Sequence, residues 1–172
     1  SLASLGLLVL FWLLFTGFVQ VFRPENNSVV SGISFVLDDP GSFIISVLVF
    51  LFVMFGMVLL HESFHGLFFW LFTRDKPKFG FKVVYAFTGA PGWYISKVPY
   101  IIIGIAPLVA ITMMGLPLLL IVPEGWILPI LIFITMNASG AAGDIYTIIW
   151  LLKKPDHILI SDSGDRVKIY SD

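Results

Sequence analysis

The 172-residue sequence contains no cysteine, and this absence excludes several kinds of site. Disulfide bonds, thiolate metal ligands and cysteine nucleophiles are all ruled out. Charged residues are scarce as well, at 12% of the chain against about 25% in a typical soluble domain. The net charge is −1, which gives no electrostatic attraction for nucleic acid, so no nucleic-acid partner is expected.

Apolar residues take the place of the missing charges. They make up 58% of the chain, and the mean hydropathy is +0.98. Water would not solvate so much apolar surface, so a lipid bilayer has to cover most of it. We therefore expect an integral, multi-pass membrane protein.

Four apolar stretches have the roughly 20 residues that a helix needs to cross a bilayer. They cover residues 2–22, 42–72, 98–121 and 126–152. The first is longer than the apolar core of a signal peptide, and no basic residue precedes it, so we expect a retained span. The sequence thus predicts an all-α membrane protein of four transmembrane helices, forming one domain over residues 1–152 with a short tail over 153–172.

Two segments outside the spans carry β-forming residues. Residues 78–85 partly alternate in polarity and are followed by a turn signal at 89–92, which predicts a small β-hairpin between the second and third spans. In the tail, residues 158–160 and 167–170 are short β-like runs on either side of a turn at 162–165. We expect at most a small hairpin on the polar side of the membrane there.

The basic residues predict an orientation. Five lie in the connection between the second and third spans and four in the tail, whereas the short turn between the third and fourth spans has none. By the positive-inside rule, both termini and the 73–97 segment face the cytoplasm. An even number of spans satisfies this arrangement.

Ionisable side chains are rare within the spans and fall in two places. Glu62 and Asp144 are the only acidic residues there, and His61 and His65 the only histidines. Each costs at least ~2–3 kcal/mol near the centre of a lipid-exposed helix, so each should face inward and have a partner.

Residues 61–65, His-Glu-Ser-Phe-His, have the H-E-x-x-H spacing. On a helix this spacing places both imidazoles on one face, where they can bind one metal ion, with Glu62 beside them to polarise a metal-bound water. The alternative is a structural role, in which the histidines bridge helices and Glu62 forms an ion pair. No basic residue within the spans is present to neutralise Glu62, which favours metal binding.

Asp144 is the obvious third ligand, because a catalytic zinc usually takes three protein ligands. His65 precedes Arg74 by nine residues and Asp144 precedes Lys153 by nine, so both groups lie roughly 13 Å below the cytoplasmic surface. The alternative is a buried carboxylate bonded to hydroxyl or main-chain groups. His157 lies in the tail and is expected to be a surface residue.

Residues upstream of Asp144 add detail to this site. Asn137 is two helical turns earlier, where its amide either binds substrate or forms a helix–helix hydrogen bond. The small residues at 140–143, together with Gly56 and Gly66 in the second span, would let two helices approach closely.

Taken together, these motifs resemble those of the putative zincin peptidases, which are small multi-pass membrane proteins, and more distantly those of site-2 intramembrane metalloproteases. The near resemblance runs from the second span into the tail. It implies zinc ligation by His61, His65 and Asp144, a general base at Glu62 and substrate positioning by Asn137. The later motif departs from the site-2 pattern: Gly140 replaces a proline, and residues 143–145 are Gly-Asp-Ile in place of Leu-Asp-Gly.

The expected function is therefore a zinc-dependent, membrane-embedded peptidase, acting on a protein or peptide that is itself soluble or membrane-associated. One ion is expected, and the ligands also suit other first-row divalent metals. A strand over residues 79–85 either receives an extended substrate or packs on the bilayer surface. The alternatives are a membrane hydrolase of a non-peptide substrate and a non-catalytic membrane adaptor with a structural metal. A metal transporter is disfavoured, because the first and third spans contain no ionisable side chain.

Overall fold

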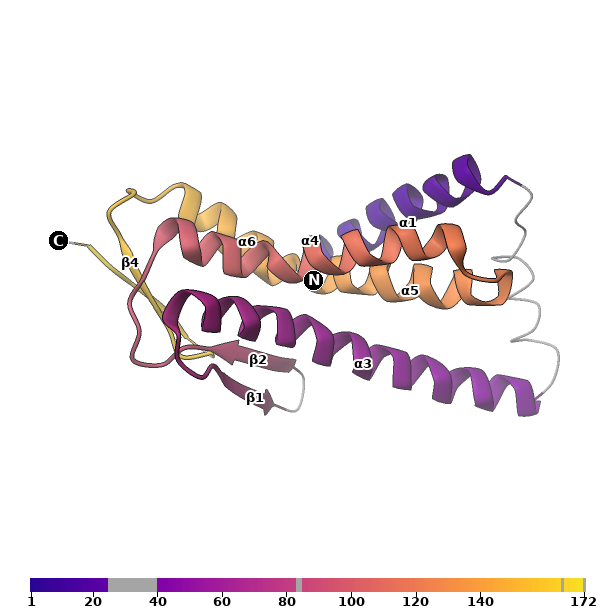
Figure 1. The fold of residues 1–172 in the computed structure, drawn as a ribbon, viewed down its shortest axis with the longest axis horizontal. Helices are drawn as coiled ribbons and strands as arrows, with labels where there is room; N and C mark the ends of the chain where they lie inside the picture. Colours follow the sequence, from indigo (N-terminus) through magenta and orange to yellow (C-terminus); the bar gives the residue numbers. More distant parts are fainter. Residues whose placement is uncertain (25–39, 83–84, 165, 172) are drawn as a thin grey trace. The chain divides into compact units, whose positions relative to one another are not determined.

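The computed structural model describes residues 1–24, 40–82, 85–164 and 166–171. Residues 83 and 84, at the end of the predicted β-like stretch 78–85, and Asp165 of the predicted tail turn lie outside these described residues. The elements follow one another along the chain in this order (Figure 1): α1 (Leu2–Phe22), α3 (Pro40–Thr73), β1 (Lys78–Lys82), β2 (Tyr85–Gly89), β3 (Ile95–Ser96), α4 (Lys97–Ile121), α5 (Glu124–Gly140), α6 (Ala142–Leu152), β4 (Leu159–Asp162) and β5 (Val167–Tyr170).

Within the part of the chain that the structure describes, four helical segments are long and apolar enough to cross a membrane. They are α1, α3, α4 and the combined segment of α5 and α6. Many of their large apolar side chains are exposed: Phe52 of α3 and Ile121 of α4 are each 77% exposed. A bilayer can cover such surfaces, whereas water solvates them poorly. The four predicted spans are confirmed as helices of the length and composition that a multi-pass membrane protein needs.

The fourth predicted span consists of two helices. α5 ends at Gly140 and α6 begins at Ala142, with a turn at Ala141 between them. Glycines at 140 and 143 flank the turn, and glycine weakens a helix by about 1 kcal/mol relative to alanine. The sequence did not reveal the break, because the small residues around it leave the apolar stretch continuous and long enough for one span.

The chain forms two compact units. Unit 1 comprises Ser1–Met57 and Ile111–Gly140, and unit 2 comprises Val58–Ala110 and Ala141–Asp172. The helices α3 and α4 each contribute residues to both units. All of the ionisable residues that the sequence analysis placed at the metal site belong to unit 2.

In unit 1, α1 packs against α5. Ser139 Oγ of α5 donates a hydrogen bond of 2.9 Å to the Ser4 carbonyl of α1. At the far end of α1, the Arg23 guanidinium donates to the carbonyls of Leu119 and Val122, at 3.2 and 2.7 Å. The last carbonyls of a helix have no helical partner and carry partial negative charge, so Arg23 stabilises the end of α4.

The predicted hairpin is present in unit 2. β1 and β2 pair antiparallel, with Lys78 opposite Gly89 and Lys82 opposite Tyr85. The hairpin is docked on α3, since the ring of Phe79 fills the space beside Gly66, where a Cβ atom would collide with it. The space beside Gly66 is therefore filled by an aromatic ring of the hairpin, and not by the closely packed helix that the sequence analysis expected there.

The tail is part of the core of unit 2. β4 pairs antiparallel with both β3 and β5, which gives a three-stranded sheet in the order β3-β4-β5. Ile158 and Ile160 are buried in one cluster with Phe69 of α3 and Tyr100 of α4. The predicted β-like tail is confirmed, but its apolar residues pack against the helices, so it is more than a small hairpin on the polar side.

Lys97 connects the start of α4 to the segment after α6. Its ammonium group donates to the Lys154 carbonyl at 2.6 Å and to the Asp156 carboxylate at 2.8 Å. The hydrogen bond from this ammonium lowers the pKa of the Asp156 carboxyl below its ordinary value. Lys97 is only 6% exposed. Lys97, which the sequence analysis counted among the basic residues of the connection between the second and third spans, is therefore a buried residue that binds the start of α4 to the segment after α6.

Candidate metal centre

The two histidines of the H-E-x-x-H sequence present their rings on one face of α3, as the spacing predicted. His61 and His65 are each 8% exposed. Their ring centroids lie 5.0 Å apart, with the ring planes at 72°. Both imidazoles are thus buried and close enough to bind the same metal ion.

Helix α6 brings Asp144 to both rings. His61 Nε2 lies 3.2 Å from Asp144 Oδ2, and His65 Nε2 lies 3.5 Å from Oδ1. The ligand atoms of the three side chains all lie within 4.8 Å of one another. In a tetrahedral zinc site with bonds of about 2.0–2.1 Å, neighbouring ligand atoms are about 3.3 Å apart. The two histidine–aspartate separations are close to this value, so the three groups could hold a single ion.

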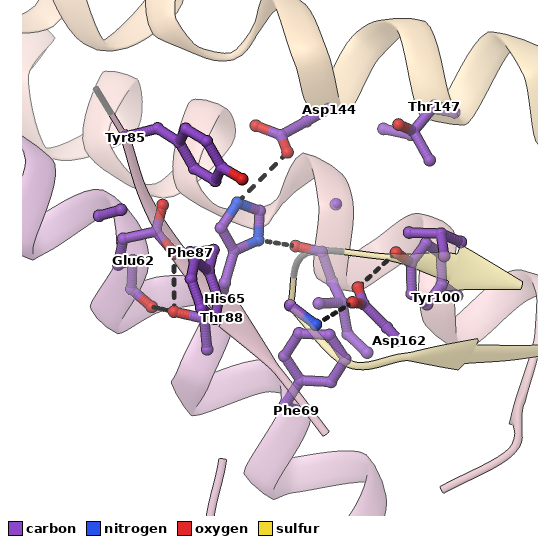
Figure 2. Close-up of a pocket in the computed structure, with 16 residues that line it drawn as sticks. Glu62, His65, Phe69, Tyr85, Phe87, Thr88, Tyr100, Asp144, Thr147 and Asp162 are labelled. Atoms are coloured by element: carbon purple, nitrogen blue, oxygen red, sulfur yellow. Dashed lines mark hydrogen bonds and ion pairs between the residues drawn. The ribbon is translucent and has the colours of Figure 1, made fainter. Parts of the chain in front are cut away.

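The main chain fixes which nitrogen of His65 faces Asp144. His65 Nδ1 lies 2.9 Å from the carbonyl oxygen of Ile103, which can only accept, so Nδ1 carries the proton. A neutral ring then turns the lone pair of Nε2 toward a carboxylate oxygen (Figure 2). Two acceptors that face one another need a cation between them, either a proton or a metal ion. Imidazole nitrogens and a carboxylate suit a first-row divalent ion.

Glu62 lies next to His61 on α3, and its carboxylate is held from the hairpin. Thr88 Oγ1 of β2 donates to Glu62 Oε2 at 2.7 Å, and the same hydroxyl lies 3.2 Å from the Glu62 carbonyl oxygen (Figure 2). Thr88 is buried, at 8% exposure. The sequence analysis did not find Thr88, because a threonine in a strand is the ordinary case.

These groups line a pocket of about 240 Å³ whose residues all belong to unit 2. Glu62, His65 and Asp144 form its polar wall, and aromatic rings from α3, α4 and β2 form much of the rest. Among the described residues that line it, none is a lysine or an arginine. The pocket therefore combines acidic groups with apolar walls, which suits a cation held together with a partly apolar substrate.

Asp162 and Tyr100 form a second polar pair at the wall of the pocket. The Tyr100 hydroxyl donates to Asp162 Oδ2 at 2.6 Å, and the Gly164 N–H donates to Oδ1 at 2.7 Å (Figure 2). Burial raises the pKa of the Asp162 carboxyl above its ordinary value. The sequence analysis assigned Asp162 to a tail turn, since Tyr100 is 62 residues away and no local pattern links the two.

Residues 54–159 match a protein family described as putative zincin peptidase. The chain belongs to this family. The matched segment contains the H-E-x-x-H sequence, the hairpin and Asp144, so the resemblance inferred from the motifs is confirmed. No curated protein and no solved structure matches the chain. The similarity to site-2 proteases stays a prediction.

The zincin peptidase family match also contains Asn137, the predicted substrate-binding residue. Asn137 is fully buried on α5 in unit 1. The turn at Ala141 lies between it and Asp144, so the two residues belong to different helices. A role for Asn137 in substrate binding stays a prediction. His157 is exposed in the tail, as expected of a surface residue.

The family match ends at residue 159, before the end of the pocket wall. Asp162, Gly164 and Val167 line the pocket and lie beyond that residue. In this member of the putative zincin peptidase family, the C-terminal strands therefore complete a pocket whose candidate metal ligands all fall within the matched segment.

Proposed function

We propose that this protein is a zinc-dependent, membrane-embedded peptidase, in which His61, His65 and Asp144 hold the ion and Glu62 is the general base. The observation that carries the proposal is the convergence of two imidazole Nε2 atoms on one carboxylate, with a second carboxylate in the same pocket. The description of the family agrees with this activity.

The side chains around the ligand set have distinct parts in the proposed reaction. A bound divalent ion would polarise a scissile carbonyl and make a water molecule more acidic. Glu62 would accept the proton of the attacking water and return it to the leaving amine. Thr88 bonds Oε2 of Glu62, so Oε1 is the oxygen that would take the proton. The Ile103 carbonyl would keep Nε2 of His65 turned toward the ion.

The position of strand β2 at the pocket supports a peptide as the substrate. Residues 85–88 of this strand line the pocket, and β2 pairs with β1 alone in the described two-stranded sheet. An extended polypeptide can add to such an edge through main-chain hydrogen bonds. The sequence analysis assigned this edge to residues 79–85, whereas the strand that borders the pocket is Tyr85–Gly89.

Metal analysis of the purified protein tests the ligand set. The wild-type chain should carry about one zinc ion, whereas His65→Ala and Asp144→Ala should each lose most of it under the same dialysis. Glu62→Gln should keep the ion, because Glu62 is not among the three ligands. Equal zinc in all four proteins would contradict the proposed metal centre.

Hydrolysis of a mixture of quenched fluorescent peptides, measured in detergent micelles, tests the reaction. Glu62→Gln should slow cleavage by about 10²- to 10⁴-fold at an unchanged zinc content, which is the usual contribution of a general base. Glu62-dependent cleavage of ester or phosphodiester probes, with all peptides intact, would favour a non-peptide hydrolase. Zinc binding without any hydrolysis would favour an adaptor with a structural metal.

A further inference from the structure

Among the described residues, Thr88 makes the shortest polar contact of the Glu62 carboxylate, at 2.7 Å. A threonine hydroxyl has one proton to donate, and the carboxylate is both the nearer and the stronger of its two acceptors. With 8% exposure, Thr88 has little access to water as a competing partner. This hydrogen bond therefore restricts the Glu62 side chain.

Glu62 needs such a restraint if it is to transfer protons. A glutamate side chain has several freely rotating bonds, and ordering it costs up to about 2 kcal/mol of entropy. A misplacement of about 1 Å at a reacting group can cost about a hundred-fold in rate. The described pocket lining contains no lysine or arginine that would hold the carboxylate in place of Thr88.

The hairpin itself is held firmly enough to act as the support. Thr88 lies opposite Phe79 in the β1–β2 register, and the Phe79 ring packs against Gly66, one turn along α3 from Glu62. Just beyond β2, the Ala90 N–H donates to the Asp162 carbonyl at 3.0 Å, which ties this end of the hairpin to β4. Thr88 is therefore anchored on both sides.

We propose that Thr88 is a positioning residue for catalysis: its hydroxyl orients the Glu62 carboxylate toward the metal centre and joins the hairpin to the catalytic turn of α3. The inference rests on the proposed function of Glu62. It assigns a second role to the strand that borders the pocket, because β2 would hold the general base as well as offer its edge to the substrate.

Two substitutions at Thr88 separate the hydroxyl from the shape of the side chain. Thr88→Val keeps the branched shape and the strand propensity but removes the donor, so kcat should fall by about ten- to a hundred-fold. KM should stay within about two-fold of wild type, since main-chain pairing of the substrate is untouched. Thr88→Ser restores the hydroxyl and should restore most of kcat. Zinc content should be equal in all of these proteins.

Thr73→Val is the matched control. Thr73 is also buried, at 6% exposure, and its hydroxyl donates to the Phe69 carbonyl of its own helix. Thr73 is not among the described residues that line the pocket. This variant should lose some stability while kcat stays at the wild-type value. A wild-type kcat in Thr88→Val, or equal losses in Thr88→Val and Thr88→Ser, would overturn the positioning role.

The unfolding temperature provides a readout that needs no substrate. Thr88→Val should lower it by a few degrees in the wild-type chain, and by less in a Glu62→Ala chain, which lacks the carboxylate acceptor. Equal losses in both chains would overturn the Thr88–Glu62 contact even in an active enzyme. If the wild type cleaves no peptide while this difference persists, the proposed peptidase function fails and the contact is supported.

Discussion

Asp162 is a carboxyl group whose partners are a phenol and a main-chain amide. Tyr100 and Gly164 each donate one hydrogen bond to it, and both bonds favour the ionised form. Burial acts the other way and is the larger effect, so the pKa of Asp162 is raised. The residue lies outside the spans, at the end of a strand that the core of unit 2 encloses.

The raised pKa of Asp162 predicts a pH dependence of stability. A carboxyl group whose folded pKa exceeds its unfolded value of about 3.9 takes up protons on folding. Its contribution to the free energy of unfolding is fully present at pH values below the unfolded pKa. This contribution is lost as the pH rises through the folded pKa. The unfolding temperature of the wild type, relative to Asp162→Asn, should therefore fall as the pH rises above about 4.

Thermal unfolding of both proteins in detergent, after removal of metal with a chelator, measures this difference. Asparagine does not titrate, and all other groups are common to the two chains, so the difference curve isolates Asp162. If the unfolding temperature of the wild type relative to Asp162→Asn rises with pH, the hydrogen bond from Tyr100 has a larger effect on the pKa of Asp162 than burial has.

At the scale of elements, two glycines have positive φ and lie in different turns. Gly164, with φ of +93°, lies between β4 and β5, and Gly92, with φ of +86°, lies between β2 and β3. The Trp93 N–H donates to the Ala90 carbonyl at 3.2 Å, so residues 90–93 form a turn with Pro91 and Gly92 at its centre. The turn that the sequence predicted at 89–92 is present one residue later, but it joins β2 to β3 and is not the turn of the hairpin.

The two glycines differ in what surrounds them, and this difference gives a prediction. A Cβ atom at Gly164 would collide with the ring of Phe87, whereas one at Gly92 would meet nothing within 4 Å. Gly92→Ala should therefore cost only the ~1–2 kcal/mol of a left-handed backbone. Gly164→Ala should cost a further ~1–3 kcal/mol for the steric conflict.

Chemical denaturation of the two glycine variants checks this ordering. Phe87 lines the pocket, so Gly164→Ala should also reduce peptide cleavage, while Gly92→Ala should leave it near the wild-type rate. Equal losses of stability would mean that the Phe87 ring moves aside without cost.

The elements also show which features a sequence can reveal. His61, His65 and Asp144 could be predicted because polar groups in an apolar stretch need a partner, and helical spacing fixes the face they share. Thr88 and Asp162 could not, because threonine is common in strands and aspartate in turns, and their partners are distant in the chain. The break at residue 141 was also hidden, since hydropathy does not register a one-residue turn between two apolar helices.

At the scale of the whole molecule, charge is distributed unevenly along the chain. All lysines and arginines except Arg23 belong to unit 2, which also contains the pocket. Basic residues near the ends of spans are retained on the cytoplasmic side. We therefore expect β1, β2 and the tail to face the cytoplasm, and water and substrate to reach the pocket from that side.

The absence of cysteine makes this orientation measurable without background labelling. Lys76, Glu124 and Lys168 are exposed positions at which single cysteines can be introduced. In intact cells, a membrane-impermeant maleimide should label Glu124→Cys alone, and permeabilisation should expose all three. The reverse pattern would contradict the predicted orientation. Between Lys76 and Lys168 the chain contains α4 and the α5–α6 segment, and two membrane crossings would leave both positions on the same side. Labelling of Lys76→Cys and Lys168→Cys on opposite sides would therefore contradict two crossings.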